Sequence, residues 1–473
     1  MQRNQRILGR WGLCFAAGLL MVLGTFAWRG NSSGPPTVSP LPQDPDIQVF
    51  FNHSRANRYI EPYRQTERYG DDLEQVILAA IDSATESIDI AIQELNLPNI
   101  AKALVSKHKR GIKVRLILEN QYSQPWSRQM GRGAQQDERS RRKLENLLAF
   151  SDRNDDGQLT AQEALTGDAL LILQTAQVPI LDDTADGTKG SGLMHHKFMV
   201  VDGQRVLTGS VNWTFSGIHG DQLVPESRGN ANALLQIDSS DLAQIYTDEF
   251  KLMWGDGPGG QANSLFGSPK PARAPQQVLL AGSTVTVQFS PNRADTPPPE
   301  TVNGLIASTL AQADREIDLA MFVFSDQGIA NTLANKADLG VSVRALIDRS
   351  FAYRSYSEAL DMVGVSLPDH RCQYEKDNRP WRSPIEAVGY PELPDGDKLH
   401  HKFALIDGAT VIVGSHNWSK AANTQNDENL LVIRNPTVAR HFQREFERLY
   451  GQASLGQTPY LQNQIAKYQQ KCG

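Results

Sequence analysis

The sequence of 473 residues has little cysteine, no excess of positive charge and few long apolar segments. Its three cysteines are too few for a disulfide framework, and no CxxC pair indicates a structural zinc site. Lys and Arg total 47 against 53 Asp and Glu, a net charge of -6, which argues against binding nucleic acid over a broad basic surface. With 40% hydrophobic and 21% charged residues, the composition excludes both wholesale disorder and a polytopic membrane protein.

One segment is apolar over a length that could cross a membrane. Residues 11–28 form an uncharged run of 18 residues, preceded by Arg3, Arg6 and Arg10. This run has the minimum length for a spanning helix, exceeds a usual signal-peptide core, and is not followed by a clear A-x-A cleavage site. We therefore expect residues 1–29 to be a membrane anchor, with a cleaved signal as the alternative. The arginines would stay cytoplasmic, and the catalytic body would lie on the periplasmic, lumenal or extracellular side.

The charge of the exported part differs from that of the whole chain. Residues 1–30 contain four arginines and no acidic residue, so the remainder has 43 basic and 53 acidic residues and a net charge of -10. In the translocated compartment Cys372 and Cys472 could form a disulfide, although two free thiols are the favoured expectation.

Two linkers divide the exported part. Residues 30–45 are rich in Ser, Pro and Gly, and residues 255–279 contain GDGPGG and SPKPARAP, so neither is expected to be buried. Between and after them lie two comparable halves, residues 46–254 and 280–452, followed by a tail over 453–473. In both halves strands alternate with helices at matching places, which predicts an α/β fold with a largely parallel or mixed sheet and indicates a tandem duplication.

The most specific signal is a motif that occurs once in each half. One copy begins at His195 and reads HHKFMVVDGQRVLTGSVNW; the other begins at His400 and reads HHKFALIDGATVIVGSHNW. Both have the spacing His-x-Lys-x4-Asp-x6-Gly-Ser-x-Asn. The apolar runs around Asp-Gly predict a β-hairpin, on which alternate residues share a face. His195 and Lys197 therefore point the same way, as do Ser210 and Asn212, and such a group suits a phosphate.

The duplicated motif resembles that of the phospholipase D superfamily, metal-independent phosphodiesterases with two such motifs, and the resemblance covers nearly all of residues 46–452. It implies two homologous α/β sandwich halves that pack about a pseudo-twofold axis, so that a monomer has one active site. His195 and His400 would be nucleophile and general acid/base, with His195 forming a phosphohistidine. The resemblance implies these further site residues: Lys197, Asp202, Ser210, Asn212, Lys402, Asp407, Ser415, Asn417 and Glu428.

The resemblance gives these residues different roles. The lysines and asparagines would hold the non-bridging phosphate oxygens, with the serines assisting by hydrogen bonds. Asp202 and Asp407 stand in Asp-Gly turns, which favours turn fixing over direct catalysis. A downstream carboxylate is expected to orient an imidazole, and the second half has Glu428 where the first half has Asn232. We therefore expect weaker support for His195, because an amide stabilises an imidazolium less than a carboxylate does.

The first half contains an insertion. From Ile88 to His195 is 107 residues, whereas the equivalent interval from Ile317 to His400 is 83. The surplus falls around residues 138–167, where a charged amphipathic helix precedes the segment DRNDDGQLTAQE.

That segment matches the twelve-residue EF-hand loop and predicts a structural or modulatory Ca²⁺ site. Gly157 would permit the sharp turn and Leu159 would tie the loop inward. The alternative is an acidic surface loop before a helix, with Thr160 or Asp156 as the cap. The expected ligands are Asp152, Asn154, Asp156, the carbonyl of Gln158, Thr160 and Glu163. No cofactor is expected for catalysis itself.

Three interpretations of the function remain. We favour a phospholipase D that hydrolyses phospholipid head groups, because of the anchor, the acidic body, and Trp213, Phe215 and Trp418 beside the site, which could meet a membrane interface. The alternative is an exported nuclease, because the Gly-Ser-x-Asn-Trp ending resembles compact superfamily members that include endonucleases and cardiolipin hydrolases. The third is an inactive lipid-binding module, indicated only by Asn232.

Overall fold

The computed structural model describes residues 38–129, 138–188 and 192–472. They belong to one compact unit that runs from residue 37 to residue 473. The expected membrane anchor, residues 1–29, lies outside the described residues. Within the described ranges, no helix is long and apolar enough to cross a membrane.

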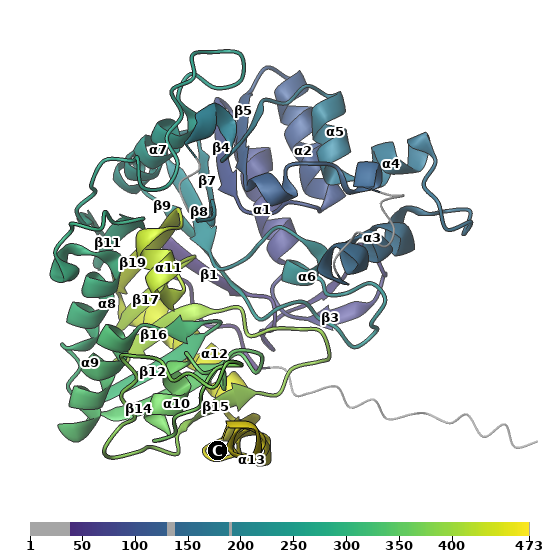
Figure 1. Cartoon of the computed structure of the whole chain (residues 1–473). Coiled ribbons are helices and arrows are strands. Elements are labelled where there is room, and N and C mark those ends of the chain that lie inside the picture. The colour runs from purple at the N-terminus through teal and green to yellow at the C-terminus, as the bar shows by residue number, and fades with distance from the viewer. Residues whose placement is uncertain (1–37, 130–137, 189–191, 473) are drawn as a thin grey trace, which may run out of the picture. The chain divides into compact units, whose positions relative to one another are not determined.

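A mixed sheet of seven strands forms the centre of the first half (Figure 1). Its order is β1-β9-β8-β7-β4-β5-β6, in which β4, β5 and β6 are parallel and the other neighbours pair antiparallel. The strands are β1 (Ile47–Phe51), β4 (Ser87–Ile92), β5 (Lys113–Leu118), β6 (Ile180–Asp182), β7 (Lys197–Val201), β8 (Arg205–Gly209) and β9 (Ala233–Asp238).

A sheet of nine strands forms the centre of the second half, in the order β10-β11-β19-β17-β16-β12-β14-β15-β20. From β11 to β15 this order repeats that of the first sheet, with one further strand at each edge. The strands are β10 (Gln276–Leu280), β11 (Ser283–Ser290), β12 (Glu316–Met321), β14 (Ser342–Ile347), β15 (Val388–Pro391), β16 (Lys402–Ile406), β17 (Thr410–Gly414), β19 (Glu428–Arg434) and β20 (Ala453–Leu455). The prediction of a mixed α/β fold is therefore confirmed.

Four short strands form two separate ladders. They are β2 (Arg58–Ile60) with β3 (Glu67–Tyr69), and β13 (Phe324–Ser325) with β18 (Trp418–Ser419).

Helices pack on the sheets, and side-chain caps fix where several of them begin. Ser239 caps α7 by accepting from the N–H of Leu242, and Asn435 caps α12, whose first residue is Pro436. The helices are α1 (Leu73–Ser83), α2 (Pro98–Lys109), α3 (Glu138–Ser151), α4 (Ala161–Gly167), α5 (Ala169–Thr175), α6 (Phe215–Ile218), α7 (Ser240–Trp254), α8 (Val302–Leu310), α9 (Gln327–Asp338), α10 (Glu358–Met362), α11 (Lys420–Thr424), α12 (Pro436–Tyr450) and α13 (Pro459–Cys472).

One hydrophobic core is shared by both halves, and each half has a further core of its own. In the shared core, Tyr246 of α7 makes edge-to-face contacts with Phe198 of β7 and Phe289 of β11, at ring-centroid distances of 5.0 and 5.2 Å. The amide of Asn429 in β19 donates to Thr208 Oγ1 of β8 and to the Tyr246 hydroxyl, both at 2.9 Å. The halves are therefore joined by apolar packing and by buried hydrogen bonds.

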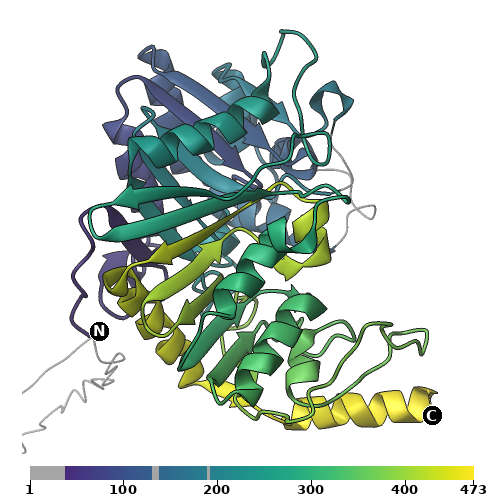
Figure 2. The ribbon, with the colours of Figure 1, turned by 90° about the vertical axis from the view of Figure 1, so that its left-hand side faces the viewer.

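The segment expected to be an unburied linker, residues 255–279, is in fact packed into the structure. Phe266 is fully buried and Lys270 is 2% exposed. The Lys270 ammonium contacts the carboxylates of Glu249, at the end of the first half, and Asp427, just before β19. Its Pro and Gly content indicated the absence of regular structure but did not indicate that two of its side chains enter the core. In Figure 2 the chain leaves α7, the long teal helix, in a projecting loop before it returns to the strands.

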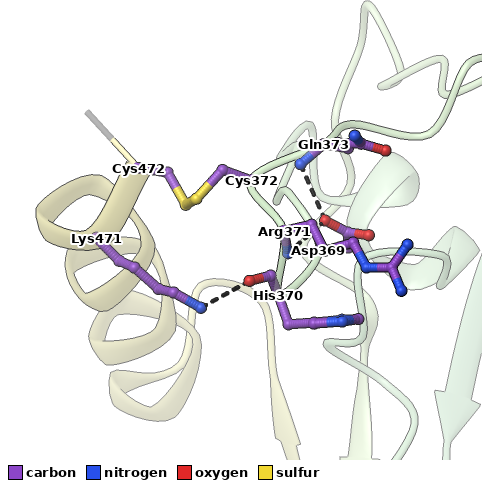
Figure 3. The surroundings of a disulfide bond; sticks show 7 residues. All are labelled: Asp369, His370, Arg371, Cys372, Gln373, Lys471 and Cys472. Carbon is purple, nitrogen blue, oxygen red and sulfur yellow. Dashed lines mark hydrogen bonds between the residues drawn. A yellow bond between two sulfur atoms is a disulfide. The ribbon is translucent and has the colours of Figure 1, made fainter.

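The C-terminal tail is also tied to the body. A disulfide joins Cys372 to Cys472 at the end of α13, and the Lys471 ammonium donates to the carbonyl of His370 at 2.8 Å (Figure 3). The expectation of free thiols was therefore wrong. The spacing of two cysteines along the chain gave no information that α13 returns to this loop.

Candidate active site

The two motif histidines lie where the halves meet, each directly ahead of a central strand. His195 precedes β7, and its N–H donates to the carbonyl of Asp427 in the other half at 2.9 Å. His400 precedes β16, and its N–H donates to the carbonyl of Ala231 at 3.0 Å. Two short parallel bridges, Met194 with Asp427 and Ala231 with Leu399, run beside these contacts. The backbone of each histidine is thus fixed by the opposite half.

Each imidazole also contacts a side chain from the opposite half. His195 Nδ1 lies 2.7 Å from Glu428 Oε2, and His400 Nδ1 lies 2.9 Å from Asn232 Oδ1. The expectation that His195 lacks a carboxylate was therefore wrong. It assumed that each histidine contacts the downstream residue of its own half, whereas each contacts the residue of the opposite half. His195 has the carboxylate and His400 has the amide.

The two motif serines contact the residues that hold the imidazoles, Glu428 and Asn232. Ser415 donates to Glu428 Oε2 at 2.7 Å, and Ser210 donates to Asn232 Oδ1 at 2.8 Å. Each serine hydroxyl also accepts a backbone N–H, from Asn429 at 3.1 Å or Ala233 at 3.0 Å, and both side chains are buried. Their hydroxyls therefore hydrogen-bond to Glu428 and Asn232 and position these two side chains.

The side chains of the two motif lysines, Lys197 and Lys402, are almost fully buried. Lys197 donates to the carbonyl of His195 at 2.7 Å and to Gln93 Oε1 at 3.2 Å, and Lys402 donates to the carbonyl of His400 at 2.8 Å. Burial lowers the pKa of Lys197 to about 7, and burial together with the charge of Lys197 holds the pKa of Lys402 well below its usual range. An anion bound beside them would favour the charged form of both lysines.

The motif asparagines complete the inner site. Asn212 donates to Gln93 Oε1 at 3.2 Å, so Gln93 bridges the lysine and the asparagine of the first half. Among the described residues, the Oδ1 atoms of Asn212 and Asn417 are buried without a hydrogen-bond partner. Sequence reasoning missed Gln93; the only available signal was its place directly after the apolar strand β4.

This site disfavours the charged form of both imidazoles. Burial, reinforced by the charges of Lys197 and Lys402, holds the pKa values of His195 and His400 well below their usual range. Burial raises the pKa of the Glu428 carboxyl, which the neighbouring His416 and Lys197 partly offset. In the tautomer whose proton lies on Nδ1, toward Glu428, His195 would keep a lone pair on Nε2, the atom that a nucleophilic role would use.

The motif aspartates do not belong to this group. Asp202 follows β7 at the end opposite His195, so about five residues of strand separate them, on the order of 17 Å. Its carboxylate accepts from the N–H groups of Thr85, Glu86 and Ser87, each at 2.8 Å. Asp407 makes the equivalent contacts with residues 314–316. The two aspartates are therefore removed from the catalytic set and fix the turns, as their Asp-Gly position favoured.

A cavity of about 540 Å³ opens between the histidines. Its apolar lining includes Phe215, Phe322 and Phe351, and the Phe322 ring lies 4.8 Å from that of His400. Trp213 and Trp418 are 2% and 0% exposed, so the expectation that they meet a membrane interface was wrong: both belong to the hydrophobic cores.

The insertion contributes one wall of this cavity through α3. Arg142, Lys143 and Asn146 line it, and Lys143 pairs with Glu94 while its ammonium lies 4.2 Å from the ring centroid of Tyr122. The sequence predicted α3 as an amphipathic helix but gave no sign that its charged face borders the site.

The EF-hand-like loop connects α3 to α4. Asp152 and Asp156 accept from backbone N–H groups within the loop, and Leu159 packs beside the small cluster under α3, as expected. The Glu163 carboxylate accepts from the N–H groups of Arg153 and Thr160, both at 2.8 Å, and Thr160 caps α4. Across the described ranges, no group of three or more His, Cys, Asp or Glu side chains is placed to hold a metal ion.

The loop nevertheless has the chemistry that Ca²⁺ prefers, a set of carboxylate, amide, hydroxyl and carbonyl oxygens around a left-handed Gly157 with φ 75°. In this conformation the Glu163 carboxylate is occupied by the capping box, so binding would require it to turn into the loop.

Comparison with known proteins places the chain in a family. A family model described as "Cardiolipin synthase, PLD-like domain" matches residues 77–254 and 306–450, parts of both halves. Mitochondrial cardiolipin hydrolase of Xenopus tropicalis is 31% identical over 141 residues, which is 30% of this chain and 57% of that protein. A phospholipase D of Rickettsia felis is 30% identical over 145 residues, 31% of this chain and 62% of that protein.

The chain therefore spans little more than half the length of the curated relatives that it matches. Among solved structures, phosphatidylserine synthase of Haemophilus influenzae covers 91% of this chain and 94% of its own, with a TM-score of 0.52 and 11% identity, a likeness of fold alone. Because the family match extends over most of the chain and both motifs, the chain belongs to the phospholipase D superfamily, in the family of the cardiolipin synthase, PLD-like domain.

Proposed function

We propose that this chain is a phospholipase D-type phosphodiesterase that hydrolyses phospholipid head groups. The observation that carries the proposal is the crossed support of the imidazoles, His195 by Glu428 and His400 by Asn232. Each half supplies one histidine and the residue that holds the other, so one site requires both halves. We infer that the halves are related by a pseudo-twofold axis at this point and that a monomer has a single active site.

The two unequal partners favour unequal roles. His195 Nε2 attacks phosphorus, and the bond from phosphorus to the head-group oxygen breaks as that oxygen takes a proton from His400 Nε2. Water then attacks the phosphohistidine, gives its proton to His400 Nε2, and displaces His195. Glu428 stabilises the positive charge that develops on His195, whereas the amide of Asn232 leaves a protonated His400 more acidic and so a better proton donor.

Lys197 and Lys402 would stabilise the transition state. Their ammonium groups and the amides of Asn212 and Asn417 would hold the non-bridging oxygens, on which negative charge increases during attack. Burial lowers the pKa values of both lysines and of His400. The negative charge of a bound phosphate would raise these pKa values and so favour charged lysines and a protonated His400. No metal is required for these steps.

A lipid substrate is supported by the phenylalanines of the cavity, by the net charge of -10 after residue 30, and by relatives named cardiolipin hydrolase and phospholipase D. The test incubates the full chain in detergent with phosphatidylcholine, cardiolipin and single-stranded DNA in parallel, with and without chelator. Release of head group that is insensitive to chelator is expected. Cleaved DNA without lipid turnover would favour the nuclease, and binding of lipid without turnover would favour an inactive module.

We also propose that the loop from Asp152 to Glu163 binds Ca²⁺, through the six residues predicted above. The donor chemistry and the inward packing of Leu159 support this, with Glu163 exchanging its backbone contacts for the ion. Calorimetry should detect Ca²⁺ binding to the wild-type chain and at least tenfold weaker binding to Glu163→Gln. Equal heats for both would remove the proposal.

For localisation, we propose a membrane-anchored protein whose catalytic body is on the translocated side. The Cys372–Cys472 disulfide supports an oxidising compartment. Protease added to intact cells, or to spheroplasts of a bacterial host, should digest the body; protection until the membrane is lysed would place it in the cytoplasm instead.

A further inference from the structure

The catalytic cavity has a second cationic region that the proposed chemistry does not use. Arg142 of α3 and Lys398, two residues before His400, both line the cavity, together with the histidines. They come from different halves and from segments outside the duplicated motif. The inner lysines are buried beneath the imidazoles, whereas the Arg142 side chain is 48% exposed.

The structure holds Arg142 at the edge of the cavity. Its Nε lies 2.5 Å from Asp221 Oδ2, and the Asp221 backbone is itself fixed, since its N–H donates to Ser227 Oγ at 2.8 Å. The guanidinium lies over the backbone before Lys398: a Cβ added to Gly396 would meet Arg142 Nη2 at 3.1 Å. Asp221 therefore fixes one edge of the guanidinium beside the 396–398 segment.

Lys398 is fixed at its backbone and not at its ammonium. Its N–H donates to Asn230 Oδ1 at 2.9 Å and its carbonyl accepts from Ala231 at 2.8 Å. Within the described part of the chain, no carboxylate lies within ion-pair distance of its ammonium. The adjacent Asp397 carboxylate is engaged by the Ser227 hydroxyl at 2.5 Å and by the N–H groups of Arg228 and Gly229 at 2.8 and 3.1 Å.

Lys143, the neighbour of Arg142, holds α3 in this position. It pairs with the buried Glu94, and its ammonium lies 4.2 and 5.4 Å from the ring centroids of Tyr122 and Trp126. The second half also lines the cavity with the apolar rings of Phe322 and Phe351. A cavity of about 540 Å³ has the size of a small-molecule site and holds more than one phosphate.

We infer that Arg142 and Lys398 form a second anion subsite, which binds a further phosphate group on the head-group side of a phospholipid while its scissile phosphate lies between the histidines. This inference rests on the proposed phosphodiesterase function. A fixed guanidinium and an ammonium are suited to a phosphate, the first by paired N–H donors and the second as a mobile charge. The insertion would thereby determine substrate preference.

The test compares two soluble short-chain lipids that differ only in a terminal phosphate, dihexanoyl phosphatidylglycerol and dihexanoyl phosphatidylglycerol phosphate. The wild-type chain should prefer the second, mainly through KM. Arg142→Gln and Lys398→Gln should each reduce that preference about tenfold or more, because each removes a charged hydrogen-bond partner. Arg142→Lys should restore part of it.

The matched control is Arg141→Gln. Arg141 lies on the same helix, is 64% exposed and pairs with Glu145 at 3.6 Å, so its loss should leave the preference unchanged. Circular dichroism melting of both variants separates a local unfolding of α3 from loss of the subsite. Equal preference for the two lipids, or equal effects of Arg141→Gln and Arg142→Gln, would overturn the inference.

Two outcomes distinguish this inference from the proposed function. Turnover of both lipids without preference would refute the subsite and leave the phospholipase proposal intact. No turnover of either lipid, with cleavage of an oligonucleotide whose KM rises in Arg142→Gln, would refute both and assign the cationic wall to a nucleic acid.

Discussion

Glu428 and Asn232 are the two side chains that make the proposed catalytic histidines unequal. Both are buried, both accept from Nδ1 of a histidine in the opposite half, and both are held by a motif serine. They act through the imidazoles and are therefore positioning residues. A carboxylate stabilises a positively charged imidazole, whereas an amide fixes the orientation of the ring without adding charge.

Replacing Asn232 by Asp should raise the pKa of His400, because a carboxylate beside an imidazole favours its charged form by about one unit or more. In the proposed mechanism His400 carries a proton when the leaving oxygen departs. The alkaline limb of the kcat/KM profile should therefore move to higher pH in Asn232→Asp, while activity at low pH changes little. Profiles of both proteins on one lipid give the comparison.

Glu428→Gln is the matched change on the other histidine. It should lower kcat by roughly 10²-fold or more, since the charge that develops on His195 loses its counterion. If Asn232→Asp instead left the alkaline limb in place, or if Glu428→Gln had no effect on kcat, the assignment of unequal roles would fail.

The β7–β8 and β16–β17 hairpins show how an element can carry a motif residue that has no chemical role. Asp202 and Asp407 adopt a left-handed backbone with φ 51° and receive N–H groups from the loops that precede β4 and β12. They tie each hairpin to its neighbouring strand at the end remote from the histidines. The alternation of apolar residues around Asp-Gly predicted both hairpins, and the turn chemistry predicted this role.

Asp202→Ala should lower the free energy of unfolding by about 1–3 kcal/mol, because three backbone N–H groups lose their acceptor. Although burial opposes it, these hydrogen bonds lower the pKa of Asp202, so its contribution is present at neutral pH and is lost as the carboxyl is protonated in acid. Urea unfolding measures the first effect. A loss of kcat comparable with that of His195→Ala, in protein that remains folded, would return Asp202 to the catalytic set.

The insertion and the linker mark the limit of what local patterns predict. The helix of the insertion and the capping function of Thr160 followed from the sequence, but the approach of α3 to the cavity depends on Arg142 meeting Asp221, far along the chain. Likewise, Pro and Gly in residues 255–279 predicted irregular backbone. They carried no information that Lys270 would lie between Glu249 and Asp427.

For the whole molecule, the alternation of strands and helices predicted the mixed α/β architecture, and the duplicated motif predicted the residues that gather where the halves meet. The crossed support could not be predicted, because aligning the halves places Asn232 with His195 and Glu428 with His400, whereas the interface exchanges these partners. Tertiary contacts within the halves, which local patterns also do not predict, determined the Cys372–Cys472 disulfide and the burial of Trp213 and Trp418. Where the halves meet, the position of a residue along the chain did not predict which residue it contacts.

The most direct test of the account is to trap the covalent intermediate. The full chain is mixed with a phosphodiester that has an activated leaving group, such as p-nitrophenol, and is then quenched in alkali, in which phosphohistidine survives, and digested for mass spectrometry. His400→Ala should accumulate the phosphoryl adduct on His195, since that leaving group needs no proton and water is no longer activated. His195→Ala should form no adduct. An adduct on His400, or full turnover by His195→Ala, would contradict the central claim.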